Sequence, residues 1–253
     1  MDILTIGLGT IGTTYGYLFN KAGHNVEHFI RKSSKKINIT ELNVDMLDGR
    51  TNKKGNHYTD IYKVNTHTKD SYNFIFISIP AGNIESVIET LNSNNIKGTI
   101  ILCCGIWEDK QYLEKVMQGR KYILGYPVAG GNIVDTTLTC CIFDHFILEK
   151  KENSKIDDYD KLVSLFESCN IKLETSYDML EWIWLHMAIN AGVVSIAAKY
   201  ADMKNPTAAA ENLMSSSKLL AEAVCAIRET SKIIKARGVN LKYYGNELWG
   251  YKL

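Results

Sequence analysis

The chain has 253 residues, of which 45% are hydrophobic and 23% are charged, and its formal net charge is +1. This composition is typical of a globular protein with one large or two moderate domains. The near-zero charge gives no reason to expect a nucleic acid or an acidic membrane as a partner.

Cysteine usage and the N-terminus predict a cytoplasmic protein. The six cysteines include the adjacent pairs Cys103–Cys104 and Cys140–Cys141 but no CxxC spacing. We therefore expect buried free thiols in a reducing compartment, with no disulfide framework and no metal site. The first residues carry no basic leader before the apolar stretch, which argues against a signal peptide.

The first thirty residues predict a dinucleotide-binding βαβ unit. The apolar run ILTI (3–6) precedes Gly7, Gly9 and Gly12 in a G-x-G-x-x-G pattern, and a helical stretch and a second strand, NVEHFI (25–30), follow. In this context the first glycine allows a tight turn, the second lets the backbone approach a pyrophosphate, and the third lets helix and strand pack closely. The helix N-terminus adds free N–H groups that favour phosphate. The predicted phosphate contacts are Gly7, Leu8, Gly9, Thr10, Ile11 and Gly12.

The residues after the second strand predict NADP as the cofactor. NAD sites usually place an acid about 20 residues after the glycines, whereas this strand ends in FIRKSSKK, with Arg31 and Lys32 at that position. The planar guanidinium matches a 2′-phosphate, so we expect Arg31 and Lys32 to bind it. A solvated basic loop is the alternative interpretation.

The middle of the chain predicts a sheet with helices between its strands. Strands are expected at the apolar runs 73–80, 98–105, 121–128 and 137–150 and at 171–176, and helices at 83–93, 108–118 and 156–169. Residues 33–72 are polar and predict one weak strand or helix among loops. The alternation indicates an α/β fold with a Rossmann-type, mostly parallel sheet and helices on both faces.

Everything after Ser176 has helical spacing, so we expect a nucleotide-binding domain at 1–176 and an all-helical domain at 177–253. The run WIWLHMAINAGVV (182–194) is apolar except for His186 and Asn190, which stand one helical turn apart and share a face. The longer run 182–198 is still shorter than the roughly 20 apolar residues that a bilayer requires, and it also contains Ser195, which favours a buried core helix. A second long helix is predicted over about 207–237, ended by Gly238.

Ligands of open α/β sheets bind beyond the carboxyl ends of the strands. The candidate contacts there are Ser78, Ile79 and Pro80 after one strand, Cys104 and Gly105 after the next, and Gly130, Gly131 and Asn132 after the third. The first two groups are expected to face the cofactor. The paired glycines are interpreted as a loop whose backbone N–H groups approach a substrate carboxylate.

These motifs resemble those of the ketopantoate reductase family, which belongs to a superfamily with the 6-phosphogluconate and β-hydroxyacid dehydrogenases. The stretch IGLGTIGTTYGYLFNKAGHNVEHFIR is similar to the family's NADP-binding opening, and YPVAGGNIVDTTLT to the substrate loop of β-hydroxyacid dehydrogenases. WLHMAIN (184–190) is similar to the superfamily's W-x-K-x-x-x-N.

The resemblance implies NADP-dependent reduction of a small 2-keto acid, with His186 in place of the family's lysine as acid/base and Asn190 beside it. An unperturbed imidazole pKa of about 6.5 suits proton donation at neutral pH. A hydrogen-bonded core histidine is the alternative interpretation. Relatives pair through the helical domain, so the resemblance also allows a homodimer.

The chain departs from the family pattern in several places. Pro80 replaces a lysine and Cys104 an asparagine, and the sequence ends at LWGYKL, before the family's substrate-binding serine and glutamate. Either the helical domain is incomplete here or this member lacks that part of the site. An opine-type imine reductase and a catalytically silent NADP-binding paralogue are therefore kept as alternative functions.

Overall fold

The computed structural model describes residues 1–201 and 205–251, except for the side chains of residues 206 and 207. The chain forms two compact units, Met1–Met179 and Leu180–Leu253. The division lies close to the predicted boundary at residue 176. The last two residues of the predicted apolar end, Lys252 and Leu253, lie outside the described residues.

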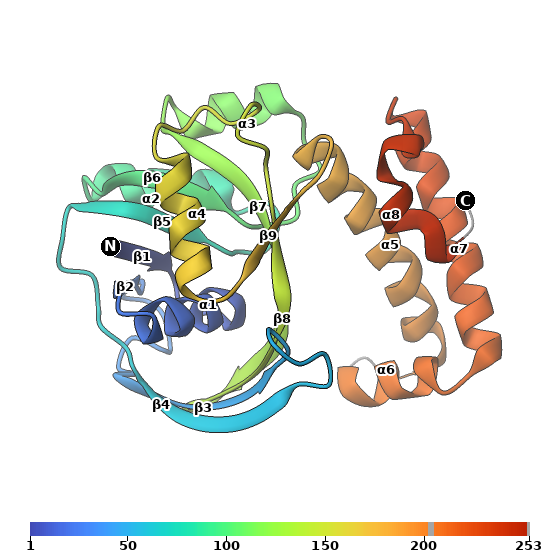
Figure 1. Cartoon of the computed structure of the whole chain (residues 1–253), viewed down its shortest axis with the longest axis horizontal. Coiled ribbons are helices and arrows are strands. Elements are labelled where there is room, and N and C mark those ends of the chain that lie inside the picture. The colour runs from blue at the N-terminus through green and yellow to red at the C-terminus, as the bar shows by residue number, and fades with distance from the viewer. Residues whose placement is uncertain (202–204, 252–253) are drawn as a thin grey trace. The chain divides into compact units, whose positions relative to one another are not determined.

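The first unit is an α/β domain built on a nine-stranded sheet (Figure 1). Its strands are β1 (Asp2–Ile6), β2 (Asn25–Phe29), β3 (Glu41–Asp48), β4 (Asn56–Lys63), β5 (Ser71–Ile77), β6 (Lys97–Leu102), β7 (Tyr122–Val134), β8 (Thr137–Leu148) and β9 (Lys172–Thr175). Its helices are α1 (Thr10–Lys21), α2 (Ile84–Ser93), α3 (Lys110–Met117) and α4 (Tyr159–Ser168).

The strand order is β2-β1-β5-β6-β7-β8-β3-β4, with β9 paired to β8. Neighbouring strands are parallel except in the pairs β3–β4 and β7–β8, so the mostly parallel Rossmann-type sheet is confirmed. The chain runs outward from β1 to β2 in one direction and from β5 through β6 to β7 in the other. Right-handed crossovers therefore place α1 on one face and α2 and α3 on the other. The order reverses between β1 and β5, which is where open α/β sheets bind ligands.

Helix α1 is held on both sides by aromatic packing. Its Tyr15 and Phe19 are fully buried. The Tyr15 ring stacks on Phe76 of β5 at 5.2 Å and meets Phe146 of β8 edge-on at 5.5 Å. Phe19 meets Phe166 of α4 at 5.7 Å. The strands β3, β4 and β8 curve around the same helix (Figure 1), and this packing fixes the position of the glycine loop that precedes it.

The polar segment 33–72 contains two strands where one weak element was predicted. In β3 the residues Leu42, Val44 and Met46 are buried and alternate with exposed or half-buried polar side chains. β3 pairs with β4 over its whole length and with the N-terminal half of β8. The alternation of Leu42, Val44 and Met46 with polar residues is the pattern of a half-buried strand, so β3 could have been predicted from the sequence.

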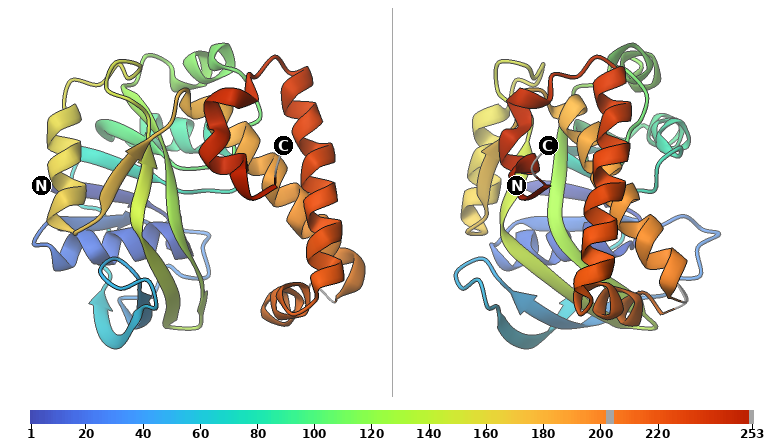
Figure 2. Two further views of the ribbon diagram at one scale, coloured as in Figure 1. Left: turned by 45° about the vertical axis from the view of Figure 1, so that its right-hand side comes forward. Right: turned by 90° about the vertical axis from the view of Figure 1, so that its right-hand side faces the viewer.

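The loop predicted at Gly130 and Gly131, after the strand 121–128, is wrong, because β7 continues to Val134 and forms a long antiparallel hairpin with β8 (Figure 2). Gly130 pairs with Cys141, Gly131 with Cys140, and Asn132 with Thr139. Gly131 has φ +141°, and a Cβ there would lie 2.1 Å from the carbonyl oxygen of Thr139. Close approach of the neighbouring strand therefore explains Gly131.

The second unit is helical, as predicted. Its elements are α5 (Met179–Tyr200), α6 (Pro206–Met214), α7 (Ser217–Ala236), η1 (Leu241–Tyr244), α8 (Gly245–Leu248) and η2 (Trp249–Tyr251). The single helix predicted over 207–237 is wrong: it is divided between α6 and α7, where the Ser216 hydroxyl accepts a hydrogen bond from the Leu219 N–H at 3.3 Å and caps α7. Figure 2 shows α7 beside α5. Thr230 donates a hydrogen bond from its hydroxyl to the Ala188 carbonyl at 2.8 Å.

Among the described residues, one helix, α5, is long and apolar enough to cross a membrane by length and composition alone. At 22 residues it is longer than the apolar run suggested. Its Ile183 and Leu185 are fully buried. Helix α5 is a partly buried core helix.

Candidate functional site

A cavity of about 500 Å³ opens at the carboxyl ends of β1, β2 and β5. This is the edge where the strand order reverses, so the sheet topology and the cavity point to the same place. The lining residues are Ile6, Gly7, Leu8, Gly9, Phe29, Ile30, Arg31, Ser33, Ser34, Lys36, Ile79, Pro80, Asn83, Ser86, Val87 and Thr90.

The glycine loop after β1 has the geometry that phosphate binding requires. Gly7 has φ +80°, which favours glycine, and its N–H donates to the Phe29 carbonyl at 2.8 Å. Gly9 is the N-cap of α1, and no side chain caps that helix end. A Cβ at Gly9 would meet nothing within 4 Å. The backbone of the first helical turn therefore faces open space, which an anion can occupy.

The role predicted for Gly12 is wrong, because a Cβ there would meet nothing within 4 Å. Gly16 carries the close packing instead. A Cβ at Gly16 would lie 3.3 Å from the Tyr62 hydroxyl and 3.4 Å from Thr5 and Val26. The sequence pattern that names the third glycine of the motif gave no signal for Gly16.

A buried histidine lies behind the loop. His28 of β2 is fully buried, and its Nδ1 lies 2.5 Å from the Thr5 hydroxyl and 3.1 Å from the Gly7 carbonyl oxygen. Its Nε2 lies 2.8 Å from the Tyr62 hydroxyl. Burial lowers the pKa of His28 to about 4, against a raising contribution from the Gly7 hydrogen bond, so the ring is neutral at pH 7. The sequence analysis did not single out His28, although it lies in the middle of an apolar strand.

The loop after β2 supplies cations to the cavity. Arg31 lines it, as predicted, together with Ser33, Ser34 and Lys36, whereas Lys32 does not. The Lys36 ammonium donates to the Leu8 carbonyl at 2.8 Å, and burial lowers the pKa of Lys36. Among the described residues that line the cavity, none carries a carboxylate. The run KSSKK could indicate a basic loop but not which of its lysines turns inward.

Only some of the remaining predicted cofactor contacts line the cavity. Ile79 and Pro80 line the cavity, whereas Ser78, Cys104 and Gly105 do not. Thr10, Ile11 and Gly12 form the first turn of α1. Cys104 is buried, and burial raises the pKa of its thiol to about 12, so it remains protonated at neutral pH.

The predicted catalytic pair lies on α5 in the second unit. His186 and Asn190 are one turn apart on that helix, and the His186 ring stacks on Trp182 with centroids 4.8 Å apart. Burial lowers the pKa of His186 to about 4. The ordinary imidazole pKa that the sequence analysis assumed is therefore wrong, and His186 is neutral at pH 7.

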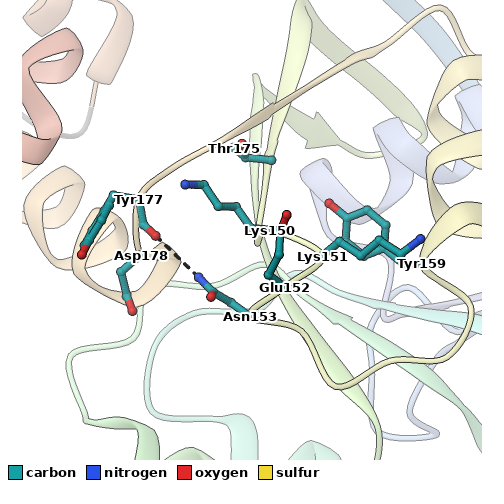
Figure 3. A pocket seen from close by; sticks show the side chains of 8 residues that line it. All are labelled: Lys150, Lys151, Glu152, Asn153, Tyr159, Thr175, Tyr177 and Asp178. Atoms are coloured by element: carbon teal, nitrogen blue, oxygen red, sulfur yellow. Dashed lines mark hydrogen bonds between the residues drawn. The ribbon is translucent and has the colours of Figure 1, made fainter.

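A second hollow, of about 710 Å³, follows β8 and has a different character (Figure 3). Its cations already have partners: Lys151 contacts Asp160 at 2.7 Å, and Lys150 lies over the Tyr177 ring at 5.7 Å. The acidic residues Glu152 and Asp178 also line it. This hollow therefore lacks the unpaired cations and the glycine loop of the cavity at the β1–β5 edge. Within the described part of the chain, no group of three His, Cys, Asp or Glu residues is placed to hold a metal ion.

Comparison with known proteins agrees with this geometry. Residues 3–126 match the family model of ketopantoate reductase PanE/ApbA. No curated protein matches the sequence significantly.

Solved structures share the fold over nearly the whole chain. A dimeric ketopantoate reductase from Staphylococcus aureus is 13% identical with a TM-score of 0.66, covering 100% of this chain and 80% of its own. The 2-dehydropantoate 2-reductase from Methylococcus capsulatus is 16% identical with a TM-score of 0.64 and the same coverage, 100% and 80%. A D-mandelate dehydrogenase bound to NADH and anilino(oxo)acetate is 14% identical with a TM-score of 0.65, covering 95% of this chain and 75% of its own. By the match of residues 3–126, the N-terminal part of the chain belongs to the ketopantoate reductase family, and the solved structures show that the fold is shared over nearly the whole chain.

Proposed function

We propose that this protein is an NADP-dependent oxidoreductase that reduces a small 2-keto acid. The observation that carries the proposal is the cavity at the β1–β5 edge, where an open glycine loop meets Arg31 and Lys36 and no lining carboxylate. A site for the 2′-hydroxyl of NAD would usually supply an acid there. The present lining suits a phosphate.

The cations favour NADP over NAD on energetic grounds. Hydrogen bonds to charged groups contribute about 1.5–3 kcal/mol each. Lys36 is half-buried and donates to the uncharged carbonyl of Leu8, so a phosphate would add a negative charge to this contact. Arg31 is exposed at the rim of the cavity, where solvent screening weakens its attraction for a phosphate.

The substrate class rests on the family and on the residues of α5. NADPH, when bound, supplies a hydride to the carbonyl carbon, and negative charge then develops on the carbonyl oxygen. We propose that His186 and Asn190 hydrogen-bond this oxygen. Because the His186 ring is neutral at pH 7, it would donate an N–H hydrogen bond, and the proton that completes the alcohol would come from water. The D-mandelate dehydrogenase among the similar folds supports a 2-keto acid class that is wider than ketopantoate.

The proposal extends to assembly and location. The Staphylococcus aureus reductase of similar fold is dimeric, and we propose a homodimer here as well. A cytoplasmic location fits the six free cysteines, of which four are buried.

A catalytically silent NADP-binding protein is the second candidate. It is favoured by the buried, protonated thiol of Cys104 and the low pKa of His186, at two positions where the family has asparagine and lysine. An imine-reducing, opine-type activity shares the first proposal's cofactor and differs only in requiring an amine with the keto acid.

The cofactor assignment is tested by titrating NADPH and NADH against the parent protein and three variants. We expect tighter binding of NADPH, with Arg31→Ala and Lys36→Met each weakening NADPH by roughly tenfold and leaving NADH nearly unchanged. Lys32→Ala is the matched control, since this neighbouring cation does not line the cavity. Equal affinity of the parent protein for both cofactors would refute the NADP assignment.

The activity is tested by following NADPH absorbance with a panel of 2-keto acids, each with and without amino acids. Turnover with a keto acid alone supports the reductase, and turnover only with an amine supports the imine reaction. Tight NADPH binding without any turnover favours the silent paralogue.

A further inference from the structure

The glycine loop is attached to β2 at two adjacent peptide groups. The Gly7 N–H donates to the main-chain oxygen of Phe29 at 2.8 Å. The Gly7 carbonyl, in the following peptide group, lies 3.1 Å from Nδ1 of His28. One backbone contact and one side-chain contact therefore fix the orientation of both peptide planes of Gly7.

We assign the proton of the neutral His28 ring to Nδ1, on the basis of its contact with a backbone carbonyl. A carbonyl oxygen can only accept, so the contact with Gly7 assigns the proton to Nδ1. Nε2 then accepts from the Tyr62 hydroxyl at 2.8 Å. The Thr5 hydroxyl lies 2.5 Å from Nδ1. The neutral ring thus has partners at both nitrogens.

The planarity of a trans peptide group links this contact to the orientation of the next N–H group in the glycine loop. The C=O and N–H of one planar peptide group point in opposite directions. Since the Gly7 carbonyl points back toward the buried His28, the Leu8 N–H of the same peptide group points away from β2. Gly7 and Leu8 both line the cavity, so the peptide group between them borders the space where a phosphate would lie.

We infer that His28 is a positioning residue for the cofactor: by holding the Gly7 carbonyl, it directs the Leu8 N–H toward the phosphates of NADP. The inference rests on the proposed cofactor binding. Without His28, Gly7 at φ +80° keeps its own N–H contact but loses the restraint on the next peptide plane. A glycine has the freedom to rotate that plane, so the phosphate donor would no longer be preoriented.

Three substitutions at His28 separate positioning from packing. His28→Leu fills the space without a donor. His28→Asn places an amide nitrogen at the position of Nδ1, whereas His28→Gln places one at the position of Nε2, out of reach of Gly7. Tyr62→Phe removes the partner at the other end of the ring and leaves the Gly7 contact intact. All five proteins are titrated with NADPH well below their melting temperatures, with binding expressed per folded molecule.

We expect His28→Leu and His28→Gln to weaken NADPH binding by about tenfold, and His28→Asn to stay within about threefold of the parent. Tyr62→Phe should lower the melting temperature and keep the parent affinity. Folded Leu or Gln variants that bind like the parent would overturn the inference, as would an Asn variant that binds as weakly as Leu.

A measurement on the parent protein needs no variant: NADPH should slow the amide hydrogen exchange of Leu8. Unchanged exchange at Leu8 in the bound protein would overturn the role of His28. Failure of the parent to bind NADPH at all would remove the proposed cofactor, and the inference with it. Parent binding together with insensitivity to His28 would remove the inference alone.

Discussion

At the scale of single residues, glycine has different roles at the N-cap of α1 (Gly9) and inside that helix (Gly16). A Cβ at Gly9 meets nothing within 4 Å, and its φ of −85° suits any residue. A Cβ at Gly16 comes within 3.4 Å of side chains from β1 and β2. Gly9 is therefore free of packing constraints, whereas Gly16 is not.

We predict that Gly9→Val abolishes NADPH binding and leaves the protein folded, because the branched side chain occupies the space that the pyrophosphate needs. Gly16→Val is the contrast: it should destabilise the fold by about 1–3 kcal/mol through overpacking. Circular dichroism melts together with NADPH titrations distinguish the two. A folded Gly9→Val protein that still binds NADPH would show that this glycine serves only the turn.

His186 is the residue whose chemistry depends most on its surroundings. Burial lowers its pKa to about 4, so at pH 7 the ring is neutral, with one N–H donor and one acceptor nitrogen. We predict that His186→Ala lowers kcat by about 10²–10³-fold, the usual effect of removing a donor to a developing oxyanion. NADPH affinity should stay near the parent value.

The pH profile provides the check on this role. Between pH 6 and 8 the parent kcat should show no inflection caused by His186. A fall in kcat with rising pH, with an apparent pKa near 6.5 that is absent in His186→Ala, would show that protonated His186 acts as the acid. Normal turnover per folded molecule of His186→Ala would remove the residue from the chemistry.

At the scale of elements, the helical unit depends on a close crossing between α5 and α7. A Cβ at Gly192 of α5 would lie 2.7 Å from the backbone nitrogen of Ile227 and 2.9 Å from its Cα. Backbone atoms cannot move aside as a flexible side chain can. Gly192 therefore sets the separation of the two helices, and the Thr230 contact with Ala188 lies beside this crossing.

We predict that Gly192→Ala destabilises the helical unit by about 1–3 kcal/mol through overpacking, although alanine is intrinsically the better helix former by about 1 kcal/mol. Gly245→Ala is the control, since a Cβ there meets nothing within 4 Å and its φ is −57°. That change should be neutral or slightly stabilising. Urea unfolding of both variants measures the difference, and a Gly192→Ala protein as stable as the parent would contradict the prediction.

At the scale of the whole molecule, the buried His28 and the half-buried His186 make stability depend on pH. In the folded protein burial lowers the pKa of both His28 and His186 from 6.5 to about 4. In the unfolded chain these rings bind protons below pH 6.5, whereas the folded protein resists protonation until about pH 4. Their stabilising contribution is therefore complete above pH 6.5 and is lost as the pH falls toward 4.

We predict that acidification from pH 7 to pH 4 lowers the free energy of unfolding, with about 3 kcal/mol lost through His28 alone, given its fall in pKa from 6.5 to about 4. His28→Asn should remove that share of the pH dependence. Glu149 opposes the trend, because burial raises its pKa. Melting temperatures measured every half pH unit provide the test, and parallel curves for parent and variant would refute it.

What the sequence determined by itself was local in origin. The strand, the glycine loop and the helix of the first βαβ unit are read from residues within thirty positions of one another, and so is the basic end of β2 where NAD sites have an acid. The alternation of strands and helices indicated the Rossmann-type sheet, and the helical spacing after Ser176 indicated the second unit. Each of these patterns arises from the period of the backbone and needs no distant partner.

Only the tertiary structure decided the properties that depend on segments far apart in the chain. In the folded protein Lys36 contacts the Leu8 carbonyl. Gly131 lies against Thr139 of the neighbouring strand β8, and Gly16 is the glycine of α1 that packs closely on the sheet. The tertiary structure also lowered the pKa values of His28 and His186. Burial and cavity lining are sums over neighbours contributed by many elements, and a pKa follows that environment and not the residue type. That dependence is why the glycine motif and Arg31 could be predicted from the sequence, whereas the roles of His28 and Lys36 beside the glycine loop could not.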